Sequence, residues 1–293
     1  MSKYRVLLFY KYVLITDPET LMNRLKSVCN ELNLKGRILI ASEGINGTVG
    51  GLLSDTEKFS SFIGTIPEFA NMKIKSSESD SEAFPRMSVK VREEIVGTKF
   101  SKEKANPLEK TAPYINAEEL KKWFENKEDF EIVDMRNDYE FEVGHFKNSI
   151  NPKLNNSRDL AEKVNDLVPI KHKKVLTVCT GGIRCEKMSA YLLNNGFENV
   201  YQLEDGMHGY MEKYPGEDFL GALYTFDGRV TMHFGGEREV IGKCRLCNEK
   251  TERYVNCSNL VCHIHFLMCD RCGDRGEVTC SQKCKEAVTV TAK

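Results

Sequence analysis

One short stretch near the middle of the chain joins a buried strand, a glycine-rich turn and the start of a helix. Residues 175–178 form an apolar run typical of a buried strand, and apolar residues return at helical spacing between 188 and 193. The turn between them reads Cys179, Thr180, Gly181, Gly182, Ile183 and Arg184. Because a strand that leads directly into a helix is typical of α/β folds with a parallel sheet, this stretch strongly constrains the fold.

Cys179 is the candidate nucleophile of this turn. Backbone N–H groups at the start of a helix and the charge of Arg184 both favour a thiolate over a thiol. Two glycines allow a tight cradle around the sulfur. A single cysteine after a strand is usually a packing residue, but these features together favour a reactive one. Cys185 is either a resolving partner for an oxidised Cys179 or a small packed side chain.

The second informative region is rich in cysteine. Residues 244–284 hold eight of the eleven cysteines. They form four close pairs, namely Cys244 with Cys247, Cys257 with Cys262, Cys269 with Cys272, and Cys280 with Cys284. No export signal is recognisable, so this spacing predicts metal ligands rather than disulfides. Four thiolates complete a tetrahedral site, which predicts two structural Zn²⁺ ions.

The pairing of these cysteines is not fixed by their spacing. We favour an interleaved arrangement, in which the first pair joins the third and the second joins the fourth, while sequential sites remain open. His263 and His265 could each replace a cysteine, but eight thiolates leave them unneeded. The segment is short and polar, so metal is expected to fold it.

The chain is predicted to be a multidomain α/β protein. Its first part follows the order βαββαβ, which is typical of a ferredoxin-like sandwich. Asp17 and Pro18 are expected to begin its first helix, and a capping box at Ser54 its second. The expected divisions are a ferredoxin-like or acylphosphatase-like domain at 1–99, a linker at 100–113, a parallel-sheet α/β domain at 114–215, a connecting segment at 216–243, the cysteine-rich zinc-binding module at 244–284 and a tail at 285–293.

Several motifs in residues 114–215 arrive in a recognisable order. They are Asp134-x-Arg136, Glu140, Gly144-His145 and the stretch from Cys179 to Arg184. Together they resemble a rhodanese domain, with Tyr210 where that family often has tryptophan. The resemblance implies that Asp134 and Arg136 brace the cysteine loop and that His145 anchors a loop. Related phosphatases have five residues between cysteine and arginine, whereas four intervene here, so the smaller loop suits a thiolate or persulfide better than a phosphoryl group.

The wider arrangement narrows the comparison. The segments 36–48 and 85–87, the central rhodanese-like domain and the cysteine-rich tail together resemble the tRNA uridine hydroxylase family. This resemblance implies an oxidoreductase that uses molecular oxygen to form 5-hydroxyuridine at the wobble position 34 of tRNA. It also implies that Cys179 is the catalytic cysteine.

Composition neither announces nor excludes an RNA partner. The formal net charge is −1, so a tRNA would need locally cationic surface. Arg86, Lys90 and Arg92 alternate along one predicted strand and are candidate phosphate contacts, although a solvated strand face is the ordinary alternative. The lysines within 99–104 and 171–174 are further candidates.

Localisation and the alternative functions complete the expectations. No apolar run approaches the roughly 18 residues of a membrane span, so a cytoplasmic protein with no membrane partner is expected. A sulfurtransferase that carries a persulfide on Cys179 would use the same loop, but would need neither the N-terminal domain nor the zinc module. A non-catalytic scaffold is the third possibility, and the intact Cys179 and Arg184 count against it.

Overall fold

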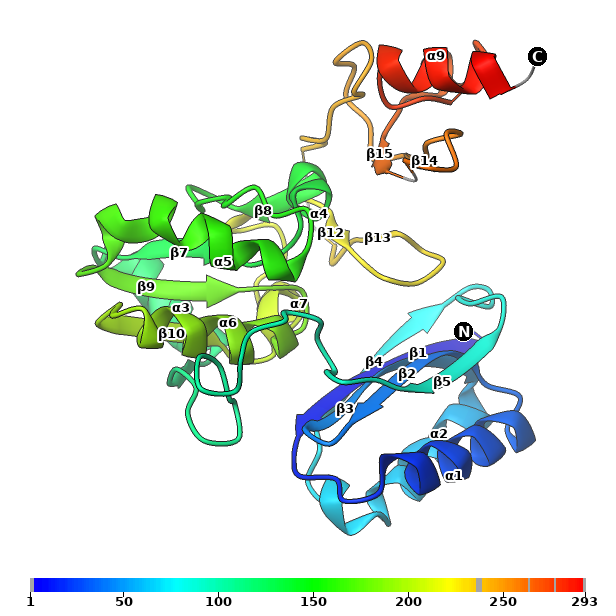
Figure 1. The fold of residues 1–293 in the computed structure, drawn as a ribbon, viewed down its shortest axis with the longest axis vertical. Coiled ribbons are helices and arrows are strands. Elements are labelled where there is room, and N and C mark those ends of the chain that lie inside the picture. Colours follow the sequence, from blue (N-terminus) through cyan, green and yellow to red (C-terminus); the bar gives the residue numbers. More distant parts are fainter. Residues whose placement is uncertain (1–2, 236–238, 263, 277, 292–293) are drawn as a thin grey trace. The chain divides into compact units, whose positions relative to one another are not determined.

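The computed structural model describes residues 3–235, 239–262, 264–276 and 278–291 (Figure 1). The chain divides into two compact units. The first comprises Met1–Ala112, Ile183–Gly196 and Phe226–Arg229, and the second comprises Pro113–Gly182, Phe197–Thr225 and Val230–Lys293. One division falls between Ala112 and Pro113, at the end of the predicted linker.

The first unit is built on a five-stranded sheet. Its elements are β1 (Tyr4–Tyr12), α1 (Pro18–Glu31), β2 (Lys35–Ala41), β3 (Gly44–Leu52), α2 (Leu53–Gly64), the 3₁₀ turn Pro67–Phe69, β4 (Ile74–Ser79), β5 (Met87–Val91) and α6 (Ile183–Asn194). The strand order is β4-β1-β3-β2-β5, and only β5 pairs in parallel, with β2. The predicted βαββαβ order is confirmed, and β5 extends the sheet at one edge.

Helices α1 and α2 cover one face of this sheet (Figure 1). Alternate strand residues such as Phe9, Ile38 and Ile40 point into the core against these helices. As predicted, α1 begins at Pro18, and the Asp17 side chain accepts a hydrogen bond from Thr20 N.

The capping box predicted at Ser54 is wrong. Strand β3 runs directly into α2, so Leu52 is the N-cap residue and it makes no side-chain capping bond. Ser54 therefore lies inside the first turn, where its side chain has no cap position to fill. The Thr56 hydroxyl instead donates to the carbonyls of Leu52 and Leu53.

The second unit contains the predicted parallel sheet, with strand order β6-β10-β9-β7. Its elements up to the sheet's last strand are β6 (Tyr114–Ile115), α3 (Ala117–Glu125), β7 (Glu131–Asp134), α4 (Asp138–Val143), β8 (Gly144–Phe146), α5 (Leu160–Lys163), β9 (Lys174–Val178) and β10 (Asn199–Leu203), with 3₁₀ turns at Ser157–Asp159 and Val164–Ile170. The remaining elements are α7 (Gly206–Lys213), β11 (Phe219–Gly221), β12 (Leu223–Tyr224), β13 (Thr231–Met232), β14 (Tyr254–Asn256), β15 (His265–Leu267), α8 (Asp270–Gly273) and α9 (Gln282–Thr291).

The core of this sheet forms around aromatic and aliphatic side chains from two helices. Trp123 of α3 and Tyr210 of α7 pack with Leu176 and Val178 of β9. Helix α3 begins after Asn116, whose side chain accepts a hydrogen bond from Glu119 N. Within the described residues, no helix combines the length and apolar character that a membrane crossing requires.

Helix α6 is the one element of residues 114–215 that belongs to the first unit. Its residues contact the segment that precedes the division. The rings of Phe100 and Tyr191 stack with centroids 4.1 Å apart, and Asn194 Nδ2 donates to Lys104 O over 2.9 Å. The predicted linker is therefore packed along a helix.

Candidate active site and cysteine tetrads

The cysteine loop begins where β9 ends. Cys179 is fully buried, and Gly182 N donates a hydrogen bond to Cys179 Sγ with an N···S distance of 3.2 Å. Gly182 has a φ of 100°, which a glycine adopts without strain. A backbone N–H that points at sulfur interacts more strongly with a thiolate than with a thiol, so this hydrogen bond would stabilise the ionised form of a buried cysteine.

The start of α7, which follows β10, packs against the cysteine loop. Met207 N donates to Cys179 O over 2.9 Å, and His208 N donates to Thr180 O over 3.0 Å. Gly206 has a φ of 63°, and a Cβ at this position would lie 2.6 Å from Cys179 O. Only glycine fits there. Sequence analysis missed this role, although a glycine between a strand and a helix was the available signal.

Asp134 and Arg136 form a buried ion pair. Arg136 Nη2 lies 2.7 Å from Asp134 Oδ2 and also donates to Gly144 O over 2.6 Å. Met135 N donates to Val178 O over 2.8 Å, which joins this segment to the residue before Cys179. The buried ion pair is therefore connected to the start of the cysteine loop through the ends of β7 and β9.

His145 anchors the end of α4. Its Nδ1 lies 2.9 Å from Phe141 O, and its ring stacks on the Phe141 ring with centroids 3.8 Å apart. Burial lowers the pKa of His145. These contacts favour a neutral imidazole with an anchoring role over one that exchanges protons.

The last residue of the loop, Arg184, lies in the first turn of α6 within the first unit. Its guanidinium carbon is 5.6 Å from the centroid of the half-exposed Phe226 ring. Asp227 and Arg229 form an ion pair with 2.6 Å between Nη2 and Oδ2, and Arg229 also donates to Ser77 Oγ over 2.8 Å. This network ties the backbone next to Phe226 to β4.

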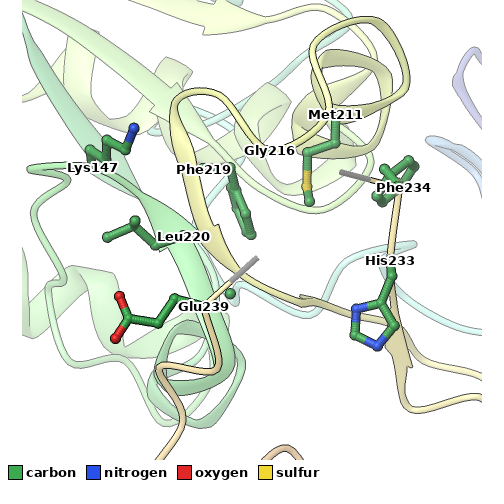
Figure 2. A pocket seen from close by; sticks show the side chains of 10 residues that line it. Lys147, Met211, Gly216, Phe219, Leu220, His233, Phe234 and Glu239 are labelled. Atoms are coloured by element: carbon green, nitrogen blue, oxygen red, sulfur yellow. The ribbon is translucent and has the colours of Figure 1, made fainter. Parts of the chain in front are cut away.

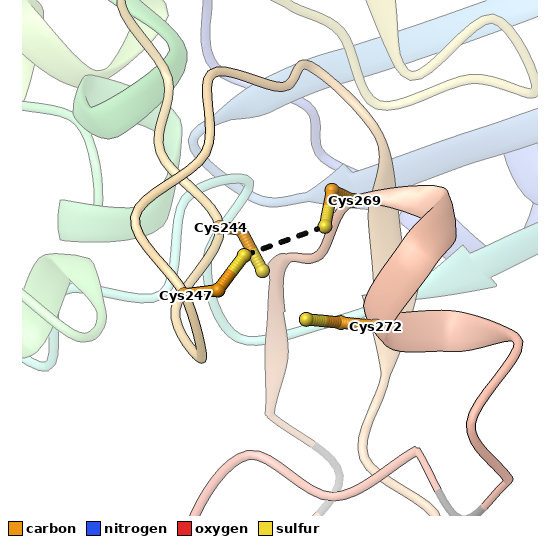
Figure 3. A group of neighbouring side chains, drawn as sticks. All are labelled: Cys244, Cys247, Cys269 and Cys272. Atoms are coloured by element: carbon orange, nitrogen blue, oxygen red, sulfur yellow. Dashed lines mark hydrogen bonds between the residues drawn. The ribbon is translucent and has the colours of Figure 1, made fainter.

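The eight tail cysteines form two tetrads. Within each tetrad the ligand atoms all lie within 4.8 Å of one another. The tetrads are Cys244, Cys247, Cys269 and Cys272 (Figure 3), and Cys257, Cys262, Cys280 and Cys284. This is the interleaved arrangement. Two thiolates on one tetrahedral Zn²⁺ would lie about 3.8 Å apart, since each Zn–S bond is about 2.3 Å long. The sulfurs of Cys247 and Cys269 are 3.6 Å apart, so each tetrad can hold a metal ion.

The thiols within a tetrad influence one another's ionisation. A hydrogen bond from the Glu249 backbone lowers the pKa of Cys247 to about 6, whereas burial raises that of Cys269 to about 12. Four thiols this close cannot all ionise without a cation between them, which is the role that a bound metal would fill.

Aromatic side chains join the cysteine-rich module to the rest of the second unit. Tyr254 OH donates to Tyr139 O, and Tyr224 OH lies 3.1 Å from His265 Nδ1. Leu267 is buried beside Tyr224. His265 thus belongs to this aromatic cluster and not to a tetrad, whereas His263 lies outside the described residues.

The candidate phosphate contacts on and beside β5 lie at the surface. Arg86, Lys90 and Arg92 are exposed, and Lys90 alternates with the buried Val89. The register of β2 against β5 places the exposed Arg37 opposite Ser88, on the face that carries Lys90. Sequence analysis missed Arg37, although the alternation in residues 37–40 was visible.

The lysines next to β9 are already paired with acidic side chains. Lys173 Nζ lies 2.6 Å from Glu131 Oε1, and Lys174 Nζ lies 2.5 Å from Glu128 Oε2. Their charges are therefore partly compensated, which makes them weaker candidates for RNA contacts than the β5 residues.

A cavity of about 100 Å³ lies elsewhere in the second unit, between Phe219, Phe234 and three charged or titratable side chains (Figure 2). Glu239 is paired with Lys250, His233 Nε2 lies 3.6 Å from Glu252, and Lys147 donates to a backbone carbonyl. None of its lining residues comes from the Cys179 loop or the tetrads. The cavity therefore has no evident part in their chemistry.

Comparisons with known proteins agree with this geometry. Residues 4–95 match the UPF0176 acylphosphatase-like domain, residues 116–213 match the rhodanese-like domain, and residues 220–285 match the rhodanase C-terminal model. The class is therefore a rhodanese-domain protein with an N-terminal acylphosphatase-like domain and a cysteine-rich C-terminal module.

Relatives along nearly the whole chain define the particular family. The chain is 40% identical to a protein from Cytophaga hutchinsonii over 97% of this chain and 91% of that one. It is 41% identical to one from Bacillus pumilus and 40% identical to one from Listeria welshimeri, over 97% of this chain and 89% and 90% of theirs. All three are named tRNA uridine(34) hydroxylase. The chain belongs to this family, which confirms the resemblance found in the sequence.

Proposed function

We propose that this protein is an oxidoreductase that hydroxylates uridine 34 of tRNA to 5-hydroxyuridine, with molecular oxygen as co-substrate and Cys179 as the nucleophile. The observation that carries the proposal is the buried Cys179 sulfur, which accepts a hydrogen bond from Gly182 N in a chain of the tRNA uridine(34) hydroxylase family. Because tRNA is the proposed substrate, we place the reaction in the cytoplasm.

Uracil chemistry gives the thiolate a specific task. The Cys179 thiolate adds to the electrophilic C6 of the base, which leaves an electron pair at C5. C5 then takes one oxygen atom from dioxygen. The second oxygen atom leaves as water, and a thiol reductant supplies the two electrons and two protons that this requires. Loss of the C5 proton expels the thiolate and restores the ring, so Cys179 is unchanged after the cycle.

The two tetrads are proposed to hold one structural Zn²⁺ each. Full cysteine ligation leaves no open position for a substrate, so the ions would stabilise the module without taking part in the reaction. The contacts of Tyr254 and His265 with Tyr139 would then hold the folded module against the rhodanese-like domain.

The face of the first sheet opposite α1 and α2 is proposed to bind tRNA phosphates through Arg37, Arg86, Lys90 and Arg92, which lie on and beside β2 and β5. Affinity for tRNA should fall steeply as the salt concentration rises. Removal of Arg37 and Lys90 together should lower the number of phosphate contacts calculated from this salt dependence by about two. Lys26→Ala is the matched control, because Lys26 is an exposed cation on α1, which covers the opposite face. An equal effect of the control would refute this binding surface.

Nucleoside analysis with isotopic oxygen tests the proposed reaction. Purified protein, a thiol reductant and tRNA from cells lacking the protein should give 5-hydroxyuridine that carries one ¹⁸O atom when ¹⁸O₂ is supplied, and none from labelled water. Cells lacking the protein should lose this nucleoside. If a thiolated nucleoside were lost instead, the function would be sulfur transfer through a Cys179 persulfide; if nothing changed, the scaffold alternative would be favoured.

A further inference from the structure

A buried lysine on α6 lies between two carboxylates of the N-terminal domain. Lys187 is 3% exposed, and its Nζ lies 2.8 Å from Glu43 Oε1 and 3.5 Å from Glu94 Oε2. All three residues belong to the first unit. Burial of an ammonium group is unfavourable unless neighbouring carboxylates compensate its charge, so the three side chains depend on one another.

The two carboxylates are themselves held in place by the backbone. Glu43 Oε1 accepts a hydrogen bond from Ile95 N over 2.8 Å, and Glu94 Oε2 accepts one from Thr98 N over 2.6 Å. Asn46 Nδ2 donates to Ile95 O over 3.0 Å. Glu43, in the turn before β3, and Asn46, in β3, therefore hold the backbone around Ile95, and the proposed chemistry does not explain this role.

Other contacts fix the same end of α6. Tyr12 OH donates to Ile183 O over 3.5 Å, and Tyr10 OH donates to Glu186 Oε1 over 3.3 Å. Thr111 Oγ1 donates to Glu186 O over 3.0 Å. The first turn of α6 is therefore held by strand β1, by the segment before the division and by the Lys187 cluster. Arg184 lies in this turn, one helical turn before Lys187.

We infer that Lys187 is a positioning residue for the cysteine loop. Its pairing with Glu43 and Glu94 fixes the start of α6, and the start of α6 is the covalent end of the loop that begins at Cys179. Fixing this end holds Arg184 in place and limits the movement of the neighbouring Gly182, whose N–H donates to the sulfur. The N-terminal domain thus has a second task beside RNA binding. This inference rests on the proposed function for its kinetic readout only.

The experiment compares two lysines with similar partners. Lys187→Met removes the charge on α6. Lys121→Met is the matched control, since Lys121 lies 2.5 Å from Glu217 Oε2 and 3.1 Å from Asp218 Oδ2 in the second unit. Lys187→Arg keeps the charge, and Glu43→Gln removes one partner charge while it preserves the shape, so both serve if Lys187→Met does not fold.

Circular dichroism gives the folded fraction. Hydroxylation kinetics give kcat and KM for tRNA, and peptide mass spectrometry gives the rate at which iodoacetamide alkylates Cys179.

For the folded protein, Lys187→Met should lower kcat at least about tenfold and leave KM for tRNA within about twofold, because a small misplacement of reacting groups slows chemistry more than binding. Alkylation of Cys179 should slow, Glu43→Gln should give a smaller change in the same direction, and Lys187→Arg should recover part of both rates. Lys121→Met should change neither rate.

Equal kcat and equal alkylation in folded Lys187→Met and wild type would overturn the inference. If wild type showed no hydroxylation, the proposed function would fail, and the alkylation rates would still decide the role of Lys187.

Discussion

The Cys179 loop and the cysteine-rich module use the same side chain in opposite ways. In the loop, one sulfur faces a backbone N–H of Gly182 and no second cysteine is needed to define the site. In the module, each sulfur lies within 4.8 Å of three others. The difference teaches that the groups around a thiol decide its role. Backbone donors can stabilise a single thiolate, whereas four crowded thiols can share one cation.

The two regions also differ in what makes them rigid. The loop is held by hydrogen bonds and close packing from α7, including contacts that only Gly206 allows. The module has short strands, and its core cluster consists mostly of the tetrad cysteines, so the proposed metal ions would supply much of its stability. Damage to the loop should therefore affect the reaction first, and damage to the module should affect folding first.

The largest expected effect separates the two roles of cysteine. Cys179→Ser should lower hydroxylation at least about 10³-fold, because serine is a far weaker nucleophile at neutral pH. The metal content should stay at two ions per chain, as measured by mass spectrometry of the metal. If the variant still hydroxylated tRNA, Cys179 would not be the nucleophile, and the proposed difference between the loop and the cysteine-rich module would be refuted.

The next prediction tests the module through its pairing. The double variant Cys244→Ser with Cys272→Ser should lose one ion per chain, because both residues belong to one tetrad. Sequential sites would instead lose two ions, since each site would then lose a ligand. The variant should also unfold part of the module at lower denaturant concentration, as zinc binding contributes about 10 kcal/mol or more to such modules.

A smaller effect is expected from the packing of the loop. Gly206→Ala should destabilise the protein by about 2 kcal/mol, because alanine pays a conformational penalty at positive φ and its Cβ would meet Cys179 O. Hydroxylation should fall as well, while the metal content should not change. Gly97→Ala is the control, since a Cβ there meets nothing within 4 Å, and it should change the free energy of unfolding by less than about 0.5 kcal/mol.

The smallest effect concerns pH. Burial lowers the pKa of His145 in the rhodanese-like domain and of His265 beside the module. The folded protein therefore binds these protons less readily than the unfolded chain, whose histidines titrate near about 6.5. This contribution to stability is complete above that pH and is lost as pH falls toward the folded pKa values. His145→Gln and His265→Gln should each reduce the difference in unfolding free energy between pH 7.5 and pH 6.0. An unchanged difference in both would contradict the burial argument.

Much of the site could be predicted because its signals are local. Cys179, the glycine pair and Arg184 follow one another, and the cysteine pairs are separated by only a few residues. Local signals also misled. The residues at Ser54 satisfy a capping box, but the direct passage from β3 into α2 leaves no cap position for them. Whether a capping motif caps a helix depends on where the adjacent strand ends and the helix begins.

Other features required the folded chain. Lys187 meets Glu43 and Glu94 only because α6 packs with the first unit, and Arg37 joins Lys90 only through the pairing of β2 with β5. The sequence likewise left open which two cysteine pairs form each tetrad, since more than one combination satisfies the same spacing.

The sequence alone therefore determined what neighbouring residues make possible, including a glycine-rich loop that begins at Cys179, four close pairs of cysteines and the order of the domains. The tertiary structure decided which thiols share a tetrad, why residue 206 must be glycine and which domain holds α6. The physical reason is that the covalent chain fixes contacts within one turn or loop, whereas contacts between distant segments depend on packing, register and the compensation of buried charge.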